Sequence, residues 1–418
     1  MKAKGFIPRG LILFFCALVA TVASVEAVSY VEENNRAVVL LEQGRYLEGL
    51  DLLKESFAAA PYEESIRQNL LHGYLAAGRS LRQQEQFSDL VQLMSEAQAF
   101  DDSRRDFWSL RGYALLRLKE YDAAEVDLQE ARVMGDPDVR ILLLLGKLYY
   151  QTDRLLEAVD LLESALLYEP SFQGLEEMLD KVRRELAVEQ EMDREYGGHF
   201  VISYDGEKNY QFGGEVLDLL EEAYLSLGSL LDYYPQNRVT VILYTRQQFS
   251  DLTESPDWAG GLYDGKIRLP VGGIQQVMPR LRMLLYHEYM HVILRDIAGQ
   301  NLPTWLNEGL AVVAETEAGV ARFEGGTLAE EQQQLFGLGR LENSFTGFNR
   351  QQSRLAYRQS YSLVQFLIEE YGWHHVRELL FALAKGSPIA EAFAQAYSIY
   401  GISYADFEDR WQLSVRFE

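Results

Sequence analysis

Apolar residues in the first part of the chain recur at the three- and four-residue spacing of amphipathic helices. This spacing extends from about Tyr30 to Leu186. Small residues recur in the same region with a period of 34 residues, since Gly112, Ala124 and Ala131 are followed by Gly146, Ala158 and Ala165. Two helices can cross closely where the side chains between them are small. The pattern therefore predicts a stack of paired helices.

The 34-residue period resembles that of tetratricopeptide (TPR) repeats. Two further segments, Asn35 to Pro61 and Gln68 to Phe100, look like additional units, the second of them longer and degenerate. We expect three or four repeats over residues 30–171, followed by a charged connector helix over residues 172–196. A stack of this kind presents a concave groove. The groove would accept a protein partner, or the array would serve only as a spacer or dimer surface.

After the connector the pattern changes to strand, helix and strand. Alternating or continuous apolar residues predict strands at His199–Tyr204 and Val239–Tyr244, with an amphipathic helix at Val216–Leu231 between them. Leu262–Val271 is predicted to be a further strand. The chain is therefore expected to be α+β overall, with an all-α TPR solenoid followed by an α+β domain over residues 197–418.

Residues 1–27 have the composition of a secretory signal peptide. Lys2, Lys4 and Arg9 precede an apolar stretch, Leu11 to Ala23, which is too short to span a bilayer comfortably. We expect cleavage after this segment and export of the protein to the periplasm or the medium, with no stable membrane span in the mature chain. Retention of the segment as an uncleaved anchor is the alternative.

Composition adds two constraints. A length of 418 residues favours two domains, and 48% hydrophobic residues suffice for large cores. The formal net charge of −24 argues against nucleic acid or anionic lipid as a partner.

The candidate chemistry lies in an H-E-x-x-H motif at residues 287–291. Residues four apart share one face of a helix, so His287 and His291 can direct two imidazoles at one metal ion. Glu288 lies about 100° further round the helix, where a carboxylate can accept a proton from water beside the metal. A catalytic zinc site needs a third protein ligand and one open position. Glu308, in the Asn-Glu-Gly segment downstream, is well placed to be that ligand. The alternative is a pair of packed or surface histidines on an ordinary amphipathic helix.

The sequence HEYMH followed by LPTWLNEGLAVVAE resembles the gluzincin metallopeptidases, and among them the bacterial peptidase-MA-like branch. The likeness extends upstream to residues 260–269 and downstream through the segment that begins at Tyr357, so it covers about the last half of the chain. The resemblance implies a zincin-like α+β fold and one Zn²⁺ per chain. It also implies that His287, His291 and Glu308 are the zinc ligands and Glu288 the general base.

The same resemblance assigns the strand before the motif to peptide binding. In gluzincins a strand at this place forms the upper edge of the cleft, and its backbone groups can hydrogen-bond an extended peptide. This role would fall on Gly261, Leu262 and Tyr263. The alternative is an ordinary strand inside a sheet.

Four further residues are candidates for supporting roles. Gluzincins often use a Tyr or His from a downstream helix to stabilise the oxyanion, and Tyr357 and Tyr361 are the candidates here. Tyr357 is preferred because it lies near the start of its helix, although each tyrosine could be a core aromatic. Asn307 and Asp296 could hydrogen-bond to the metal ligands from behind.

These features favour a zinc-dependent peptidase that acts on a peptide or protein substrate. The first alternative is a non-catalytic assembly factor of the cell envelope, in which zinc only holds the fold. The second is a repeat scaffold whose second domain is vestigial. Glu288 favours the peptidase, because a structural zinc site has no need of a base.

Overall fold

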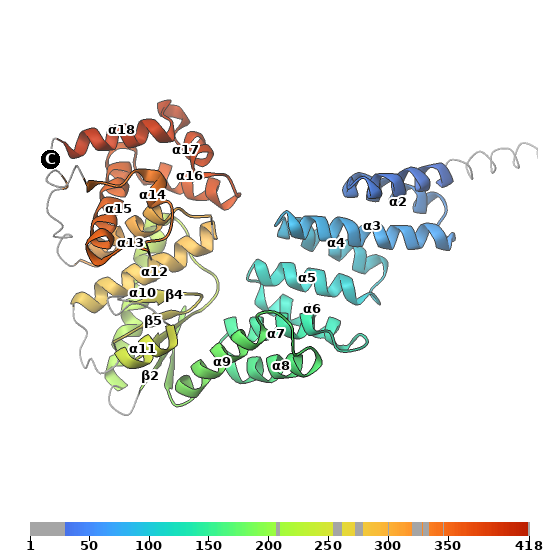
Figure 1. The fold of residues 1–418 in the computed structure, drawn as a ribbon, viewed down its shortest axis with the longest axis horizontal. Coiled ribbons are helices and arrows are strands. Elements are labelled where there is room, and N and C mark those ends of the chain that lie inside the picture. Colours follow the sequence, from blue (N-terminus) through green and yellow to red (C-terminus); the bar gives the residue numbers. More distant parts are fainter. Residues whose placement is uncertain are drawn as a thin grey trace, which may run out of the picture. The chain divides into compact units, whose positions relative to one another are not determined.

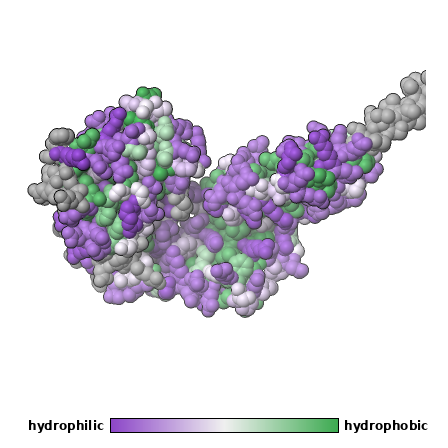
Figure 2. Space-filling view, turned by 45° about the horizontal axis from the view of Figure 1, so that its top comes forward, coloured by the Kyte–Doolittle hydropathy of each residue, from purple (hydrophilic) through white to green (hydrophobic). Residues whose placement is uncertain are grey.

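The computed structural model describes residues 30–205, 210–253, 261–271, 279–299, 301–319, 328, 334–345 and 347–416. The chain divides into two compact units (Figure 1), which we call the repeat unit, Met1–Arg183, and the sheet unit, Arg184–Glu418. The predicted signal peptide, residues 1–27, lies outside the described residues. No helix in the described ranges is long and apolar enough to cross a membrane. The surface visible in Figure 2 is mostly hydrophilic, as the charge suggests.

The repeat unit consists of consecutive helix pairs. Within residues 30–168 there are four pairs: the helical residues 30–42 with α2 (Tyr46–Ala59), α3 (Glu64–Gln83) with α4 (Phe87–Phe100), α5 (Arg105–Arg117) with α6 (Tyr121–Val133), and α7 (Val139–Gln151) with α8 (Leu155–Tyr168). The predicted solenoid of paired helices is confirmed.

Close approach of the two helices in a pair explains the repeated glycines. Gly78, Gly112 and Gly146 are each 34 residues apart. A Cβ atom built on them would lie 2.8, 2.8 and 2.9 Å from the side chain sixteen positions later in the second helix of the pair. Real Cβ atoms hardly ever come so close to a neighbour. Glycine therefore marks the crossing point in three successive pairs.

The sheet unit contains one five-stranded sheet in the order β1-β2-β3-β5-β4. Its strands are β1 (Asp193–Tyr196), β2 (Phe200–Tyr204), β3 (Val239–Leu243), β4 (Leu262–Tyr263) and β5 (Ile267–Leu269). The three central strands, β2, β3 and β5, are parallel, and the outer strands β1 and β4 are antiparallel to their neighbours. Together with the helices around the sheet, this confirms the predicted α+β class for the second half.

Two predicted elements are wrong in detail. The connector helix expected over 172–196 is α9 (Leu175–Glu189), and residues 193–196 form β1 instead. This strand is polar, so it carries no apolar alternation, and it exists because a turn at Gly197 and Gly198 pairs it with β2. The strand expected over 262–271 is a hairpin of β4 and β5, because Asp264 and Gly265 form a tight turn in which Gly265 has φ +113°.

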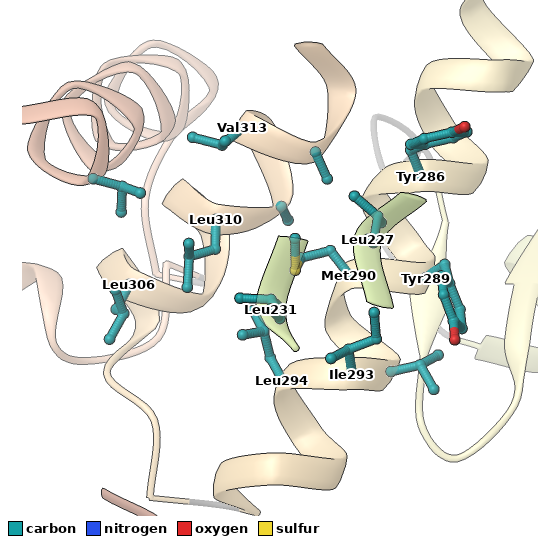
Figure 3. Close-up of a cluster of buried hydrophobic side chains, with 14 of the residues drawn as sticks. Leu227, Leu231, Tyr286, Tyr289, Met290, Ile293, Leu294, Leu306, Leu310 and Val313 are labelled. Atoms are coloured by element: carbon teal, nitrogen blue, oxygen red, sulfur yellow. The ribbon is translucent and has the colours of Figure 1, made fainter. Parts of the chain in front are cut away.

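Helices α10 (Tyr210–Leu231) and α12 (Pro279–Ala298) pack on one face of the sheet. Figure 3 shows Met290 and Leu294 of α12 in one cluster with Leu227 and Leu231 of α10 and with Leu306, Leu310 and Val313 of α13 (Thr304–Glu317). The remaining elements are α11 (Arg246–Thr253), α14 (Leu338–Leu341), α15 (Arg350–Tyr371), α16 (Trp373–Ala384), α17 (Ile389–Ala396), the short 3₁₀ helix η2 (Ser398–Tyr400) and α18 (Tyr404–Val415). Pro279 is the first residue of α12, and Thr304 is the first residue of α13.

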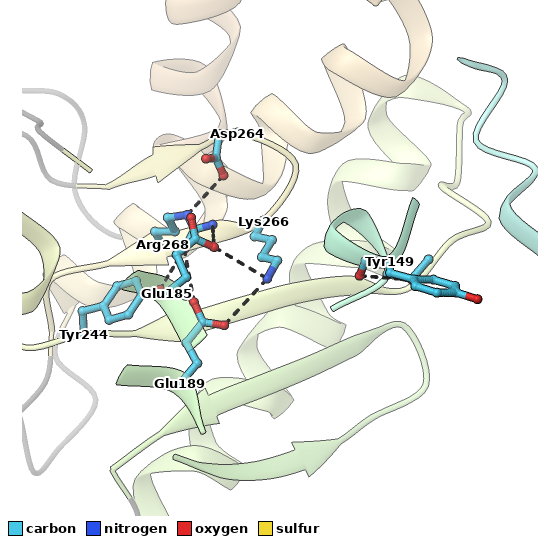
Figure 4. Close-up of polar contacts among 8 residues, drawn as sticks. Tyr149, Glu185, Glu189, Tyr244, Asp264, Lys266 and Arg268 are labelled. Atoms are coloured by element: carbon cyan, nitrogen blue, oxygen red, sulfur yellow. Dashed lines mark hydrogen bonds and ion pairs between the residues drawn. The ribbon is translucent and has the colours of Figure 1, made fainter. Parts of the chain in front are cut away.

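A buried ionic network lies on the opposite face of the sheet, where the end of α9 packs (Figure 4). Glu185 and Glu189, one turn apart on α9, meet Lys266 and Arg268 of the hairpin, and all four side chains are at most 3% exposed. Arg268 Nη2 donates to Glu185 Oε2 at 2.9 Å, and its Nη1 donates to the Tyr244 hydroxyl at 2.7 Å. Burial raises the pKa of Glu189 above its ordinary value. The network fixes the hairpin to α9.

Loss of one partner from this network is expected to be costly. Arg268→Ala should lower the free energy of unfolding of the sheet unit by about 3–5 kcal/mol, because it leaves carboxylates buried without their cation. Urea unfolding followed by tryptophan fluorescence measures this effect, since four of the five tryptophans lie in the sheet unit.

Arg377 provides the control, because it pairs at 3.9 Å with Asp232, which is 83% exposed. Arg377→Ala should cost less than about 1 kcal/mol. An equal, small effect of both substitutions would mean that the buried network contributes nothing to stability.

Candidate metal centre

Two adjoining helices bring together the three predicted ligands. His287 and His291 project from one face of α12, and Glu308 projects from the second turn of α13. Glu308 Oε2 lies 3.8 Å from His287 Nε2 and 3.7 Å from His291 Nε2. Among the described residues these three form the one group of His, Cys, Asp or Glu side chains that could hold a metal, with donor atoms within 4.8 Å of one another.

The donor set fits a zinc ion. Zinc binds imidazole nitrogen and carboxylate oxygen at about 2 Å in tetrahedral geometry, which places neighbouring donor atoms about 3–4 Å apart. The two separations between Glu308 Oε2 and the imidazole Nε2 atoms, 3.8 and 3.7 Å, lie in this range. Three protein donors also leave one tetrahedral position for water or substrate.

The orientation of both imidazoles is set by side chains of α13. His287 Nδ1 lies 2.7 Å from Glu315 Oε1, and His291 Nδ1 lies 3.1 Å from Asn307 Oδ1. With its proton on Nδ1, each ring donates to these acceptors and leaves Nε2 free to face Glu308. Asn307 also donates from Nδ2 to Glu308 Oε1 at 3.4 Å. The predicted supporting role of Asn307 thus has a direct geometric basis.

The carboxylates around the centre raise the pKa of His287. Burial opposes protonation of His287, but the hydrogen bond with Glu315 and the charges of Glu288 and Glu308 outweigh it and raise the pKa of His287 to about 9. Because metal binding requires a neutral imidazole, His287 would release a proton when it serves as a ligand.

Glu288 is enclosed beside the ligands. Its side chain is 4% exposed, and burial raises the pKa of the carboxyl group. Gly261, the residue before the edge strand β4, lies directly against this carboxylate. The structure therefore brings the predicted peptide-binding segment, Gly261 to Tyr263, to the predicted base.

The two candidate tyrosines differ in their surroundings. Both pack against the hydrophobic core, but Tyr357 also lies beside the carboxylates of Glu308 and Glu288. Burial raises the pKa of Tyr357, so it remains a hydrogen-bond donor at neutral pH. Gly309 permits this arrangement, because a Cβ there would lie 2.4 Å from the Ser360 carbonyl oxygen of α15, the helix that carries Tyr357.

One supporting residue was missed by the sequence analysis, and one predicted residue makes a contact elsewhere. Glu315 is seven residues after Glu308, so both lie on one face of α13, and this spacing could have indicated it. Asp296, predicted to support the ligands, accepts a hydrogen bond at 2.7 Å from Tyr233, which follows α10.

No curated protein matches the chain. A solved structure of a MamA mutant is 16% identical, with 38% of this chain and 90% of that chain covered and a TM-score of 0.31. The thermophilic TPR protein TTC0263 of Thermus thermophilus is 20% identical, with 42% and 95% covered and a TM-score of 0.26. The family model of the Peptidase MA superfamily matches residues 221–417, which include the whole His-His-Glu cluster.

Residues 221–417 therefore match the Peptidase MA superfamily, and in this chain an array of helix pairs precedes them.

Proposed function

We propose that the protein is a zinc-dependent peptidase that hydrolyses peptide bonds of a peptide or protein substrate. One observation carries the proposal: within the Peptidase MA domain, two imidazole Nε2 atoms converge on one oxygen of Glu308, with the buried carboxylate of Glu288 beside them. A structural metal site has no use for an additional enclosed acid.

The residues of the chain divide the chemistry among them. His287, His291 and Glu308 would hold the zinc, which when bound polarises a carbonyl group and lowers the pKa of water. Glu288 accepts a proton from the attacking water and returns it to the departing amine. Burial raises the pKa of this carboxyl group above its ordinary value, which makes it a stronger base for this transfer than an exposed carboxylate.

Two further parts of the site would position the substrate. Tyr357, protonated and adjacent to Glu308, is placed to donate a hydrogen bond to the developing oxyanion. Strand β4 is last in the sheet and is bonded on one side to β5. An extended peptide can add to the other side of such a strand through backbone hydrogen bonds.

The rest of the chain suggests where the peptidase acts. We propose that the protein is exported, on the basis of the signal-like residues 1–27. The repeat unit would dock a protein substrate or partner, because stacked helix pairs present a continuous concave surface.

Removal of the base is the decisive test of the peptidase proposal. Glu288→Gln should retain one zinc per chain and lose about 10²–10⁴-fold in kcat, because the amide is nearly isosteric but cannot accept the proton. Metal analysis and cleavage of an unstructured protein such as casein measure both properties. The control is Glu317→Gln, at an exposed position of α13.

Equal cleavage by the wild type and Glu288→Gln would refute this role for Glu288. Zinc in both variants with cleavage by neither would favour the non-catalytic alternative, in which the metal supports the fold.

Glu315 gives a second test that does not depend on activity. Glu315→Gln keeps an acceptor opposite His287 Nδ1 but removes its charge, so zinc affinity should fall about 10- to 100-fold. Competition with a chromophoric chelator measures the dissociation constant, with Glu317→Gln as the control on the same helix. Unchanged affinity would show that Glu315 does not support the metal ligand.

A further inference from the structure

The main chain at Gly261 is held in a defined position at the sheet edge. Leu262 and Tyr263, which follow it, pair with Arg268 and Ile267 of β5. Arg268 is in turn fixed by the buried ionic network. Gly261 therefore has little freedom to move away from its neighbours.

The neighbour that Gly261 meets is the carboxylate of Glu288. A Cβ atom at position 261 would lie 2.5 Å from Glu288 Oε1, 2.8 Å from its Cδ and 2.9 Å from Leu269 Cδ2. Glu288 is 4% exposed and Leu269 is fully buried, so neither side chain can turn into solvent to avoid a methyl group. The main chain of the edge strand is thus one wall of the space that the carboxylate occupies.

Space, and not backbone conformation, is the reason for glycine at this position. Gly265, in the turn of the same hairpin, has φ +113° and an open space around its Cβ position. Gly261 is the reverse case: its φ lies outside the left-handed range, but its Cβ position is filled. A left-handed backbone is therefore not what requires glycine here, whereas a side chain at this position would displace the carboxylate.

We propose that Gly261 is a positioning residue for Glu288. The missing side chain lets the carboxylate lie against the edge strand, between the backbone that would bind a peptide and the histidines that would hold the metal. This inference rests on the proposed function, because the role of Glu288 as base is itself proposed. It adds a second determinant of the position of the base, outside the H-E-x-x-H helix.

Gly261→Ala tests the inference in the full chain through kinetics. It should retain one zinc and lower kcat about 100-fold with KM changed less than about twofold, because a displacement of about 1 Å affects the chemical step. Gly339→Ala is the control, since a Cβ at that position meets nothing within 4 Å. An unchanged kcat in Gly261→Ala would overturn the inference.

A double-mutant cycle of Gly261→Ala and Glu288→Ala, measured by thermal unfolding, separates the contact between these two residues from a general packing effect. Gly261→Ala should lower the Tm by about 5 °C in the wild-type background, because a methyl group is forced against the carboxylate. In the Glu288→Ala background that shift should be clearly smaller, because Oε1 and Cδ are gone and only the contact with Leu269 remains. An equal shift in both backgrounds would overturn the inference.

The cycle also covers the remaining outcomes. If Gly261→Ala alone does not fold, recovery of folding in the Glu288→Ala background supports the contact, and failure in both backgrounds overturns it. If the wild type cleaves no peptide, the proposed function fails, and the stability cycle alone decides the role of Gly261.

Discussion

Charge removed from water is costly, and the sheet unit contains four such charges in one place. Glu185 and Glu189 of α9 and Lys266 and Arg268 of the hairpin offset this cost by pairing with one another, and Arg268 also contacts the Tyr244 hydroxyl and Asp264. Pairing of this kind tolerates little displacement, so the hairpin has essentially one position on α9. Because the hairpin carries Gly261 into contact with Glu288, the geometry of the candidate active site depends on ion pairs on the opposite face of the sheet.

The metal centre itself is organised mainly by α13. Asn307, Glu308 and Glu315 come from this one helix, and they supply a ligand together with the acceptors that orient both histidines. A rigid helix holds these groups at fixed spacing, so the two rings and the third ligand are positioned as a set. The close crossing of α13 with α15 at Gly309 then adds Tyr357 to the same set.

The parts of this arrangement that follow from local geometry could be predicted from the sequence. The four-residue spacing of His287 and His291 predicts a shared helix face from helix geometry alone. The 34-residue period likewise predicts a helix crossing that is repeated from pair to pair. Strand β1 could not be predicted, because a polar strand gains its conformation from its partner. The β4–β5 turn does have a local signal, in Asp264 and Gly265, which a prediction of one continuous strand overlooks. The contact between Gly261 and Glu288 joins residues 27 positions apart, and no spacing rule relates them.

At several positions in this chain, glycine allows two segments to approach closely. The effect of replacing it depends on the atom that an added Cβ would contact. In the repeat unit, Gly78, Gly112 and Gly146 face aliphatic side chains, which have other rotamers and can partly adjust. Gly309 faces the carbonyl of Ser360, a backbone group that moves only if a helix moves. Gly261 faces a carboxylate, where a small displacement changes chemistry before it changes the fold. Close approach at glycine therefore supports helix packing at Gly78, Gly112, Gly146 and Gly309, whereas at Gly261 it would affect reactivity. The difference lies in the group that each glycine contacts.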